Sequence, residues 1–157
     1  MKHQKTNAAR ILDRMGITYE LVAYEVDESD LSAVHVAAQL GQNVEQVFKT
    51  ILLRGDRNGV FVCIVPGAEE VNLKLAASVS GNKKAETVAM KELLPLTGYI
   101  RGGCSPLGMK KPYPIYLHSS ANQFPFVYIS AGQRGLQLKL APTDLIKAVN
   151  ATVTDLI

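Results

Sequence analysis

The sequence has few of the residues from which disulfide frameworks and metal centres are built. Its 157 residues include two cysteines and three histidines. Cys63 lies in the apolar run VFVCIVP, where a thiol is most simply a small core residue, and two cysteines do not make a disulfide framework. The histidines, His3, His35 and His118, are scattered, and no two share a helix face at a spacing of four. We therefore expect no metal site, and a reducing compartment.

Long apolar runs are absent as well. The basic N-terminal residues are not followed by the apolar segment of a signal peptide, and no run approaches the ~20 residues that cross a bilayer. These absences predict a soluble, cytoplasmic protein with no membrane partner. The net charge of +3 permits an anionic partner such as RNA without requiring one. The length fits one domain over residues 1–157.

Standard phosphate-binding loops are missing too. The glycine-rich stretch at 98–108, GYIRGGCSPLG, has neither the GxGxxG nor the GxxxxGK[ST] spacing, so we expect no nucleotide cofactor and indeed no cofactor at all. The Gly102–Gly103 pair nevertheless leaves peptide N–H groups uncovered by side chains. Such groups can hold a carbonyl oxygen, a carboxylate or a phosphate, although a plain tight turn explains the glycines equally well.

Apolar spacing, capping residues and turn signals predict the elements of the fold. Helices are expected at 8–15, 32–40, 72–80, 91–96 and from 142 onward, and strands at 18–26, 48–53, 60–66, 86–88, 115–118, 126–130 and 136–140. The turns DRNG and AGQRG predict two hairpins. Because there is no steady βαβ alternation, we predict a mixed α+β fold. Its sheet would be largely antiparallel and partly barrel-like, with about seven strands and four or five surrounding helices.

The side chains offer little conventional catalytic chemistry. No pair of carboxylates stands out for acid–base work, and Cys104 with His118 downstream is only a conceivable nucleophile and base. Lys49 lies inside a strand among apolar neighbours, where a lysine is unusual unless its amine reaches water or a ligand. A strand with one wet face explains that lysine as well. The remaining candidates are a positioning lysine, the glycine amides and the hydroxyls of Thr50, Ser105 and Ser130.

Four segments, in the same order and with similar spacing, resemble the YbaK branch of the YbaK and prolyl-tRNA synthetase editing superfamily. They are FKTILL at 48–53, NLKLAA at 72–77, TGYIRGGCSPLGMKK at 97–111 and YISAGQRGLQLKLAPTDL at 128–145. The resemblance is nearly full length and includes no synthetase-like domain. It implies a free-standing bacterial deacylase that clears Cys-tRNA(Pro), with the 3′ end of the tRNA as its partner and prolyl-tRNA synthetase as a further one.

The resemblance also implies roles for individual residues. Lys49 matches the family's active-site lysine, whose ammonium would attract the phosphate or ribose end of the substrate and orient the ester. Thr50 matches the adjacent threonine. Gly102 and Gly103 match the paired glycines of GGxSPLG, whose amides lie against the aminoacyl ester.

Three further positions are expected to bind substrate. Tyr24 matches a tyrosine that borders the pocket from an early strand, and Ser130 matches the serine of the YxSxGxRG segment. Ser105 lies within the GGxSPLG motif. Cys104 departs from the family, which usually has a small aliphatic residue there, and its thiol has no part in the implied chemistry.

In the family the thiol of the misattached cysteine attacks its own ester, releasing tRNA and a cyclic thiolactone. Alternatives remain open at this point. The protein could be a non-catalytic module that binds tRNA or prolyl-tRNA synthetase through its basic residues, Lys83, Lys84, Lys110, Lys111 and Arg134. It could also be another small ester or thioester hydrolase that uses Cys104, or an editing enzyme that prefers alanine.

Overall fold

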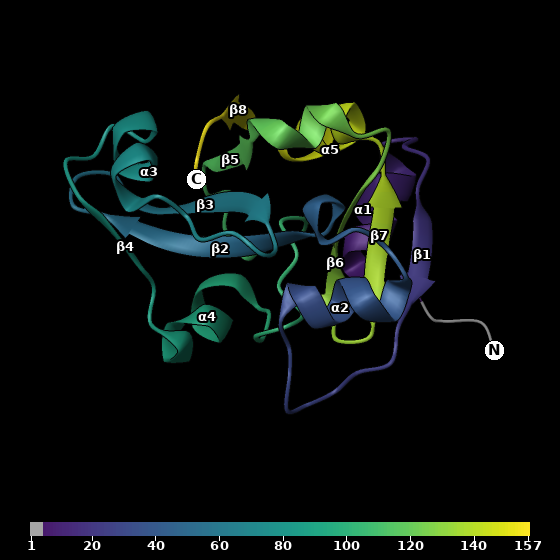
Figure 1. Ribbon diagram of the computed structural model, residues 1–157. Helices are drawn as coiled ribbons and strands as arrows, with labels where there is room; N and C mark the ends of the chain where they lie inside the picture. Colours follow the sequence, from purple (N-terminus) through teal and green to yellow (C-terminus); the bar gives the residue numbers. More distant parts are fainter. Residues whose placement is uncertain (1–4) are drawn as a thin grey trace.

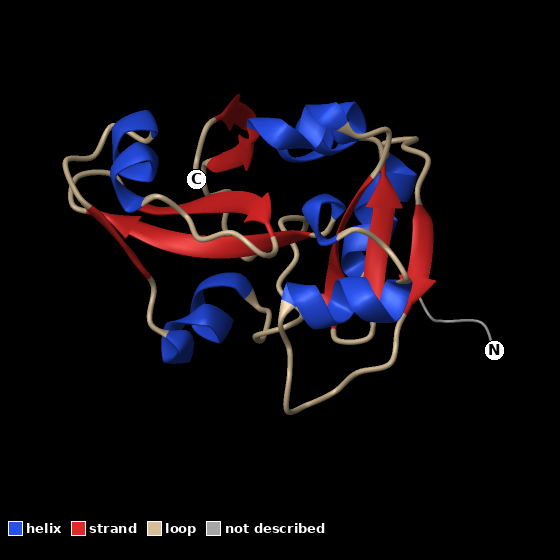
Figure 2. Cartoon of the chain, viewed as in Figure 1, coloured by secondary structure: helices blue, strands red, loops and turns tan. Residues whose placement is uncertain are grey.

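The computed structural model describes residues 5–157, whose strands form two separate sheets with helices packed around them (Figures 1 and 2). The helices are α1 (Asn7–Arg14), α2 (Ala33–Leu40), α3 (Leu73–Val79), α4 (Met90–Thr97) and α5 (Pro142–Val149), with short 3₁₀ turns η1 (Val44–Gln46) and η2 (Ser119–Gln123). The strands are β1 (Glu20–Ala23), β2 (Phe48–Gly55), β3 (Gly59–Pro66), β4 (Ala85–Thr87), β5 (Ile115–His118), β6 (Val127–Gln133), β7 (Leu136–Leu140) and β8 (Thr152–Thr154).

The mixed α+β class is confirmed, whereas the barrel-like character of the sheet is not. One sheet has the strand order β1-β7-β6 and the other has the order β4-β2-β3-β5-β8. Only the β3–β5 and β5–β8 pairs are parallel, so the predicted antiparallel majority is correct. The sequence did not reveal η2 or β8. A three-residue strand such as β8 is defined by its partner β5 and has too few residues to show a period.

The helices begin where the capping residues predict. Thr6 Oγ1 accepts the amide of Ala9, Ser32 Oγ accepts that of His35, and Asn72 Oδ1 accepts those of Lys74 and Leu75. Pro142 occupies the first turn of α5, where its missing N–H costs no hydrogen bond. Within residues 5–157 none of these helices has the length and apolar character of a membrane span.

The small sheet lies between α1 and α2 (Figure 1). On one face Leu12 of α1 is buried in a cluster with Leu138. On the other face Val36 of α2 packs against Tyr128 and Val22. Because strand residues alternate between faces, β6 and β1 supply apolar side chains to both layers, whereas the leucines of β7 all belong to the α1 layer.

The two sheets meet where β2 leaves β6. Val47, immediately before β2, forms an isolated parallel bridge with Tyr128 of β6. The bridge is isolated and no β2–β6 ladder follows it, and β4 pairs with β2 only from Leu53 onward. Within the described chain, the outer edge of β2 between Val47 and Leu52 therefore has no partner strand, and this gap positions the site described below.

A buried histidine holds the C-terminal segment in place. His118 Nδ1 accepts the amide of Leu156 at 3.0 Å, and the carbonyl of Leu156 accepts the amide of Asn72 at the start of α3, at 2.6 Å. Burial lowers the pKa of His118, and the charges of Asp155 and Glu69 oppose that shift only in part. The neutral imidazole is the form that can accept the Leu156 amide.

We predict that stability falls when this histidine is protonated. The pKa of His118 is lower in the folded than in the unfolded chain, so the unfolded chain binds more protons below pH ~6.5. The free energy of unfolding should therefore decrease as the pH drops from about 6.5 toward 5, before the carboxylates titrate. In His118→Gln, whose amide oxygen can accept the same bond, urea unfolding should lose most of this slope. An unchanged slope would contradict the assignment.

Candidate active site

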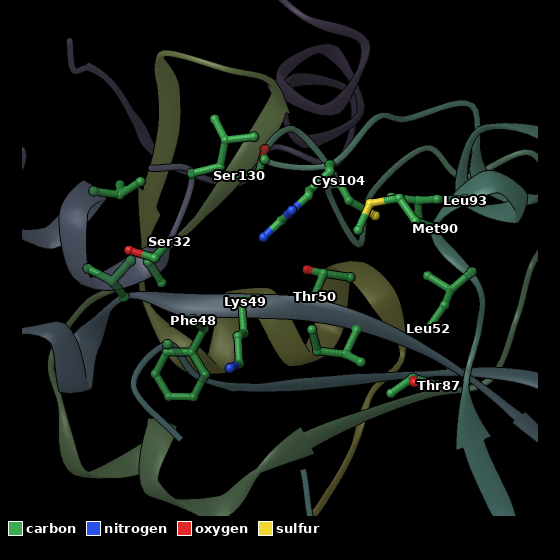
Figure 3. A pocket seen from close by; sticks show the side chains of 18 of the residues that line it. Ser32, Phe48, Lys49, Thr50, Leu52, Thr87, Met90, Leu93, Cys104 and Ser130 are labelled. Atoms are coloured by element: carbon green, nitrogen blue, oxygen red, sulfur yellow. The ribbon is translucent and has the colours of Figure 1, made fainter. Parts of the chain in front are cut away.

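A cavity of about 610 Å³ opens where β2 and β6 diverge (Figure 3). Its walls come from α2, β2, α4, β6, β7 and the glycine-rich loop. Of the predicted site residues, four line it: Lys49, Thr50, Gly102 and Ser130. A volume of this size suits a small ligand or the end of a larger one. The gap between the strands is therefore a pocket, and these four predicted site residues come together around it.

Lys49 and Thr50 leave opposite faces of β2, as neighbours on a strand must (Figure 3). Thr50 points toward the side that carries Ser130 and Cys104, whereas Lys49 points away from it. Lys49 is half-buried and has no ion-pair partner among residues 5–157. The ammonium and the hydroxyl therefore contact different parts of any ligand that occupies this cavity.

The glycine loop has one glycine that faces the cavity and one that packs the loop down. Gly102 lines the cavity at φ +83°, a conformation that side chains disfavour. Gly103 is buried, and a Cβ there would lie 3.1 Å from the Cα of Gln133. Its amide already donates to the carbonyl of Ile100 at 3.0 Å. The expected amide pair is therefore not free at Gly103, whereas the amides of its neighbours Gly102 and Cys104 have no acceptor among residues 5–157.

An arginine from the β6–β7 turn fixes this loop. Arg134 Nε donates to the carbonyl of Arg101 at 2.8 Å, and Arg134 Nη1 donates to Glu28 at 2.6 Å. One guanidinium thus joins three segments that are far apart in sequence. A planar cation that donates to two acceptors at once is held in one orientation better than a group with a single bond. The loop is therefore held against β6 and β7 before any ligand arrives.

Two predicted residues support the site from behind the cavity wall. Ser105 is fully buried, and its hydroxyl accepts the amide of Leu107 at 3.2 Å inside the loop. Tyr24 follows β1 and packs against the cluster of Val36 and Tyr128, beside the helix that lines the cavity. Ser130 does line the cavity, while its oxygen accepts the amide of Gly132 at 3.1 Å. Its hydroxyl proton remains available to a ligand.

Two polar atoms beside the cavity are buried without a hydrogen-bond partner, Thr50 Oγ1 and Gln137 Oε1. Gln137 lines the cavity, is 5 % exposed, and pairs with Ser130 across the β6–β7 ladder. Sequence reasoning missed Gln137, because in LQLKL it alternates with leucines and so is typical of a strand with one wet face. The one signal in the sequence was its expected position opposite Ser130 in the predicted hairpin. Unpaired buried polar atoms cost stability until water or a ligand pairs with them, so these two oxygens are available to a ligand in the cavity.

We predict that Thr50→Val stabilises the protein. Valine keeps the shape and removes a buried hydroxyl that has no partner, so the free energy of unfolding should rise by about 1 kcal/mol. Thr97→Val is the matched control, because the Thr97 hydroxyl is buried and bonded to Leu93 and Tyr99. The same change there should lower the free energy of unfolding. If both variants shift in the same direction in urea titrations, the interpretation of Thr50 is wrong.

Cys104 lines the cavity but is not a competent nucleophile. Burial raises the pKa of its thiol to about 12. His118 does not line the cavity, and its Nδ1 is occupied by Leu156. Because the thiolate is the reactive form, a cysteine hydrolase has no support here. Residues 5–157 also contain no group of three metal-ligating side chains, and His3 lies outside the described residues.

We predict that neither cysteine of the folded protein reacts with iodoacetamide at pH 8. Both thiols are buried, and burial raises the pKa of each to about 12. Mass spectrometry should find no modified cysteine in the folded protein over a period in which both cysteines of the urea-unfolded protein become labelled. Rapid labelling of Cys104 in the folded state would restore it as a reactive group.

A model of the aminoacyl-tRNA editing domain family matches residues 28–148. This chain belongs to that family. Over 153 residues it is 42% identical to EbsC of Enterococcus faecalis, covering 98% of this chain and 93% of EbsC. EbsC is named as a candidate Cys-tRNA(Pro)/Cys-tRNA(Cys) deacylase.

Two further relatives extend the comparison of this editing domain. YwhH of Bacillus subtilis is 26% identical over 121 residues, covering 77% of this chain and 76% of YwhH. Among solved structures, a candidate trans-editing enzyme for prolyl-tRNA synthetase superposes with a TM-score of 0.83 at 25% identity, over 98% of each chain. The match covers 98% of that structure, so the shared fold includes both sheets.

Proposed function

We propose that this protein is a free-standing editing enzyme, one domain that deacylates Cys-tRNA(Pro), and also Cys-tRNA(Cys), by cleaving the aminoacyl ester. The observation that carries the proposal is a pocket with positioning groups in which, among the described lining residues, the cysteine thiol is buried with a raised pKa and so is not an activated nucleophile. The names of EbsC and of the trans-editing relative support the same activity. The aminoacyl-tRNA would be met in the cytoplasm, with prolyl-tRNA synthetase as the partner that selects the tRNA.

In the proposed reaction the substrate supplies the nucleophile. The sulfur of the cysteinyl group attacks its own ester carbonyl, a C–S bond forms, and the bond from the carbonyl carbon to the ribose oxygen breaks. The thiol proton ends on that ribose oxygen, so the products are tRNA and a cyclic thiolactone. Intramolecular attack of this kind needs a protein that fixes the reacting atoms within contact distance. The protein therefore contributes geometry and charge.

The glycine loop would stabilise the charge that develops on the carbonyl oxygen. Gly102 and Cys104 line the cavity, their amides have no acceptor among residues 5–157, and Arg134 holds their loop in place. A preorganised amide of this kind is worth about 3 kcal/mol in the transition state. Thr50 and Gln137 would hydrogen-bond the aminoacyl group, because they lie beside the same part of the cavity with unpaired oxygens.

Lys49 would bind the ribose end of the substrate. It leaves the other face of β2 from Thr50, so it is not placed to bind the same atoms (Figure 3). This half-buried amine has no carboxylate partner among residues 5–157, so it is available to pair with the ligand. Lys49 would thus orient the ester relative to the amides of the loop.

The structure gives less support to a non-catalytic binding module. The basic residues proposed for it occupy three separate places. The amides of Lys83 and Lys84 bond Asp56 at the β2–β3 turn, Lys110 and Lys111 line a second hollow, and Arg134 is committed to Glu28. Such a distribution does not form one positive face for tRNA. The editing reading also explains the unpaired polar atoms in the cavity, which a surface module does not need.

The decisive test measures hydrolysis of Cys-tRNA(Pro) and Ala-tRNA(Pro) by the wild-type protein and by Lys49→Ala, following free tRNA and thiolactone. We expect loss of the cysteinyl ester alone, with thiolactone formed, and a decrease of at least about a hundredfold in Lys49→Ala because the ester is no longer oriented. Cys104→Ala is the control and should keep its activity. Cleavage of the alanyl ester would indicate another nucleophile and an alanine preference. If neither ester is cleaved, the enzyme hypothesis is wrong and the non-catalytic binding module becomes the better explanation.

A further inference from the structure

Arg101 is a second cation of the cavity that neither the predicted site nor the proposed chemistry uses. It lies in the glycine loop next to Gly102, lines the cavity, and is exposed. Three ion pairs occur among residues 5–157, and they involve Lys5, Arg54 and Arg134. Arg101 is in none of them. An exposed guanidinium at the edge of a pocket, without a carboxylate partner, is available to an anionic ligand.

The backbone of Arg101 is fixed although its side chain is free. Its carbonyl accepts Arg134 Nε at 2.8 Å, and Arg134 is itself held by Glu28. The next residue, Gly102, has φ +83°, and Gly103 packs directly against the backbone of Gln133. The loop therefore presents this cation at a defined place, which lowers the entropic cost of using it.

The charges around the cavity define the ligand group. Lys49 and Arg101 are the cations that line it, and Glu70 is the one carboxylate among the lining residues. The aminoacyl group carries a positive ammonium, and the ribose and adenine are neutral. In an aminoacyl-tRNA the negative charge nearest to the ester is the phosphodiester that precedes the terminal adenosine. A guanidinium matches the paired oxygens of such a phosphate better than an ammonium does.

We propose that Arg101 binds the phosphodiester on the 5′ side of the terminal adenosine and so sets the depth to which the 3′ end enters the cavity. This inference rests on the proposed function, because it takes the aminoacyl end of tRNA as the ligand. Lys49 then holds the ribose end on one side of β2, while Arg101 holds the phosphate from the glycine loop. Contacts from two cations on two different elements would fix the orientation of the bound nucleotide and would also add to its affinity.

The test is a binding measurement that does not depend on turnover. The probe is the trinucleotide CCA with cysteine joined to its 3′ end through an amide, which is not hydrolysed. A second probe replaces the last phosphodiester with a neutral methylphosphonate. Affinities are measured by fluorescence anisotropy for the wild type, Arg101→Gln, Arg101→Lys, and the control Arg57→Gln. Arg57 lies in the β2–β3 turn and does not line the cavity. Its replacement by glutamine removes the same charge as the replacement of Arg101.

We expect Arg101→Gln to weaken binding of the natural probe about tenfold to a hundredfold, as loss of a charge-assisted contact does. The methylphosphonate should weaken wild-type binding by a similar factor and should have little further effect on Arg101→Gln. Arg101→Lys should recover part of the affinity, and Arg57→Gln should behave as wild type. The slope of log affinity against log salt should fall by about 0.7 in Arg101→Gln, the value for one phosphate of a single strand.

Two results would overturn the inference. If Arg101→Gln binds the natural probe as tightly as the wild type, Arg101 makes no contact with the nucleotide. If the effects of the variant and of the methylphosphonate multiply, Arg101 contacts something other than that phosphate. Binding without hydrolysis of any aminoacyl-tRNA would contradict the proposed function while leaving the phosphate contact intact, so the two failures are distinguishable.

Discussion

The alternation of side chains along β2 is the constraint on which both the core and the site depend. Phe48 and Leu52 are buried in the cluster shared with the small sheet, whereas Leu53 belongs to the cluster around Phe61 on the other side. Thr50 has the same parity as Phe48 and Leu52, so its hydroxyl is carried to a buried side, where it finds no partner. Lys49 has the opposite parity and is carried away from it. A slip of one residue in the β2–β3 register would exchange these two faces and destroy the core and the site together.

The site combines rigidity with unsatisfied polar groups. Arg134 and the buried Ser105 hold the glycine loop, and the amide of Gly103 is used within it. Thr50 and Gln137 are left with unpaired oxygens, each of which costs stability that apolar residues would not cost. This combination is expected when a protein contributes orientation to a reaction, because the groups that meet the substrate must stand ready without collapsing onto one another.

The sequence predicted the local elements better than their assembly. The caps at Thr6, Ser32 and Asn72 act through neighbouring amides, so they are visible in short segments. The division into two sheets was missed, because it depends on the contact between β2 and β6 ending at one isolated bridge, and no local pattern marks that point. The role of Gln137 was missed for the same reason, because its neighbour Ser130 lies across a ladder. The amide of Gly103 is used in a local turn, by the carbonyl of Ile100 three residues earlier, and the glycine spacing alone does not show that bond.

The lack of an activated nucleophile among the described residues of the cavity bears on how the proposed enzyme would spare esters of amino acids other than cysteine. A pocket that admits cysteine cannot exclude alanine by size, and differences of one small group are worth only about 1 to 3 kcal/mol in binding. If the attacking atom is the substrate's own sulfur, alanyl and prolyl esters are spared because they lack it, whatever their affinity. A thiolate or an activated water supplied by the protein would remove that protection. The buried, protonated Cys104, with its pKa raised to about 12, is consistent with this requirement, because a thiol in the wall of the cavity is tolerable only if it stays unreactive.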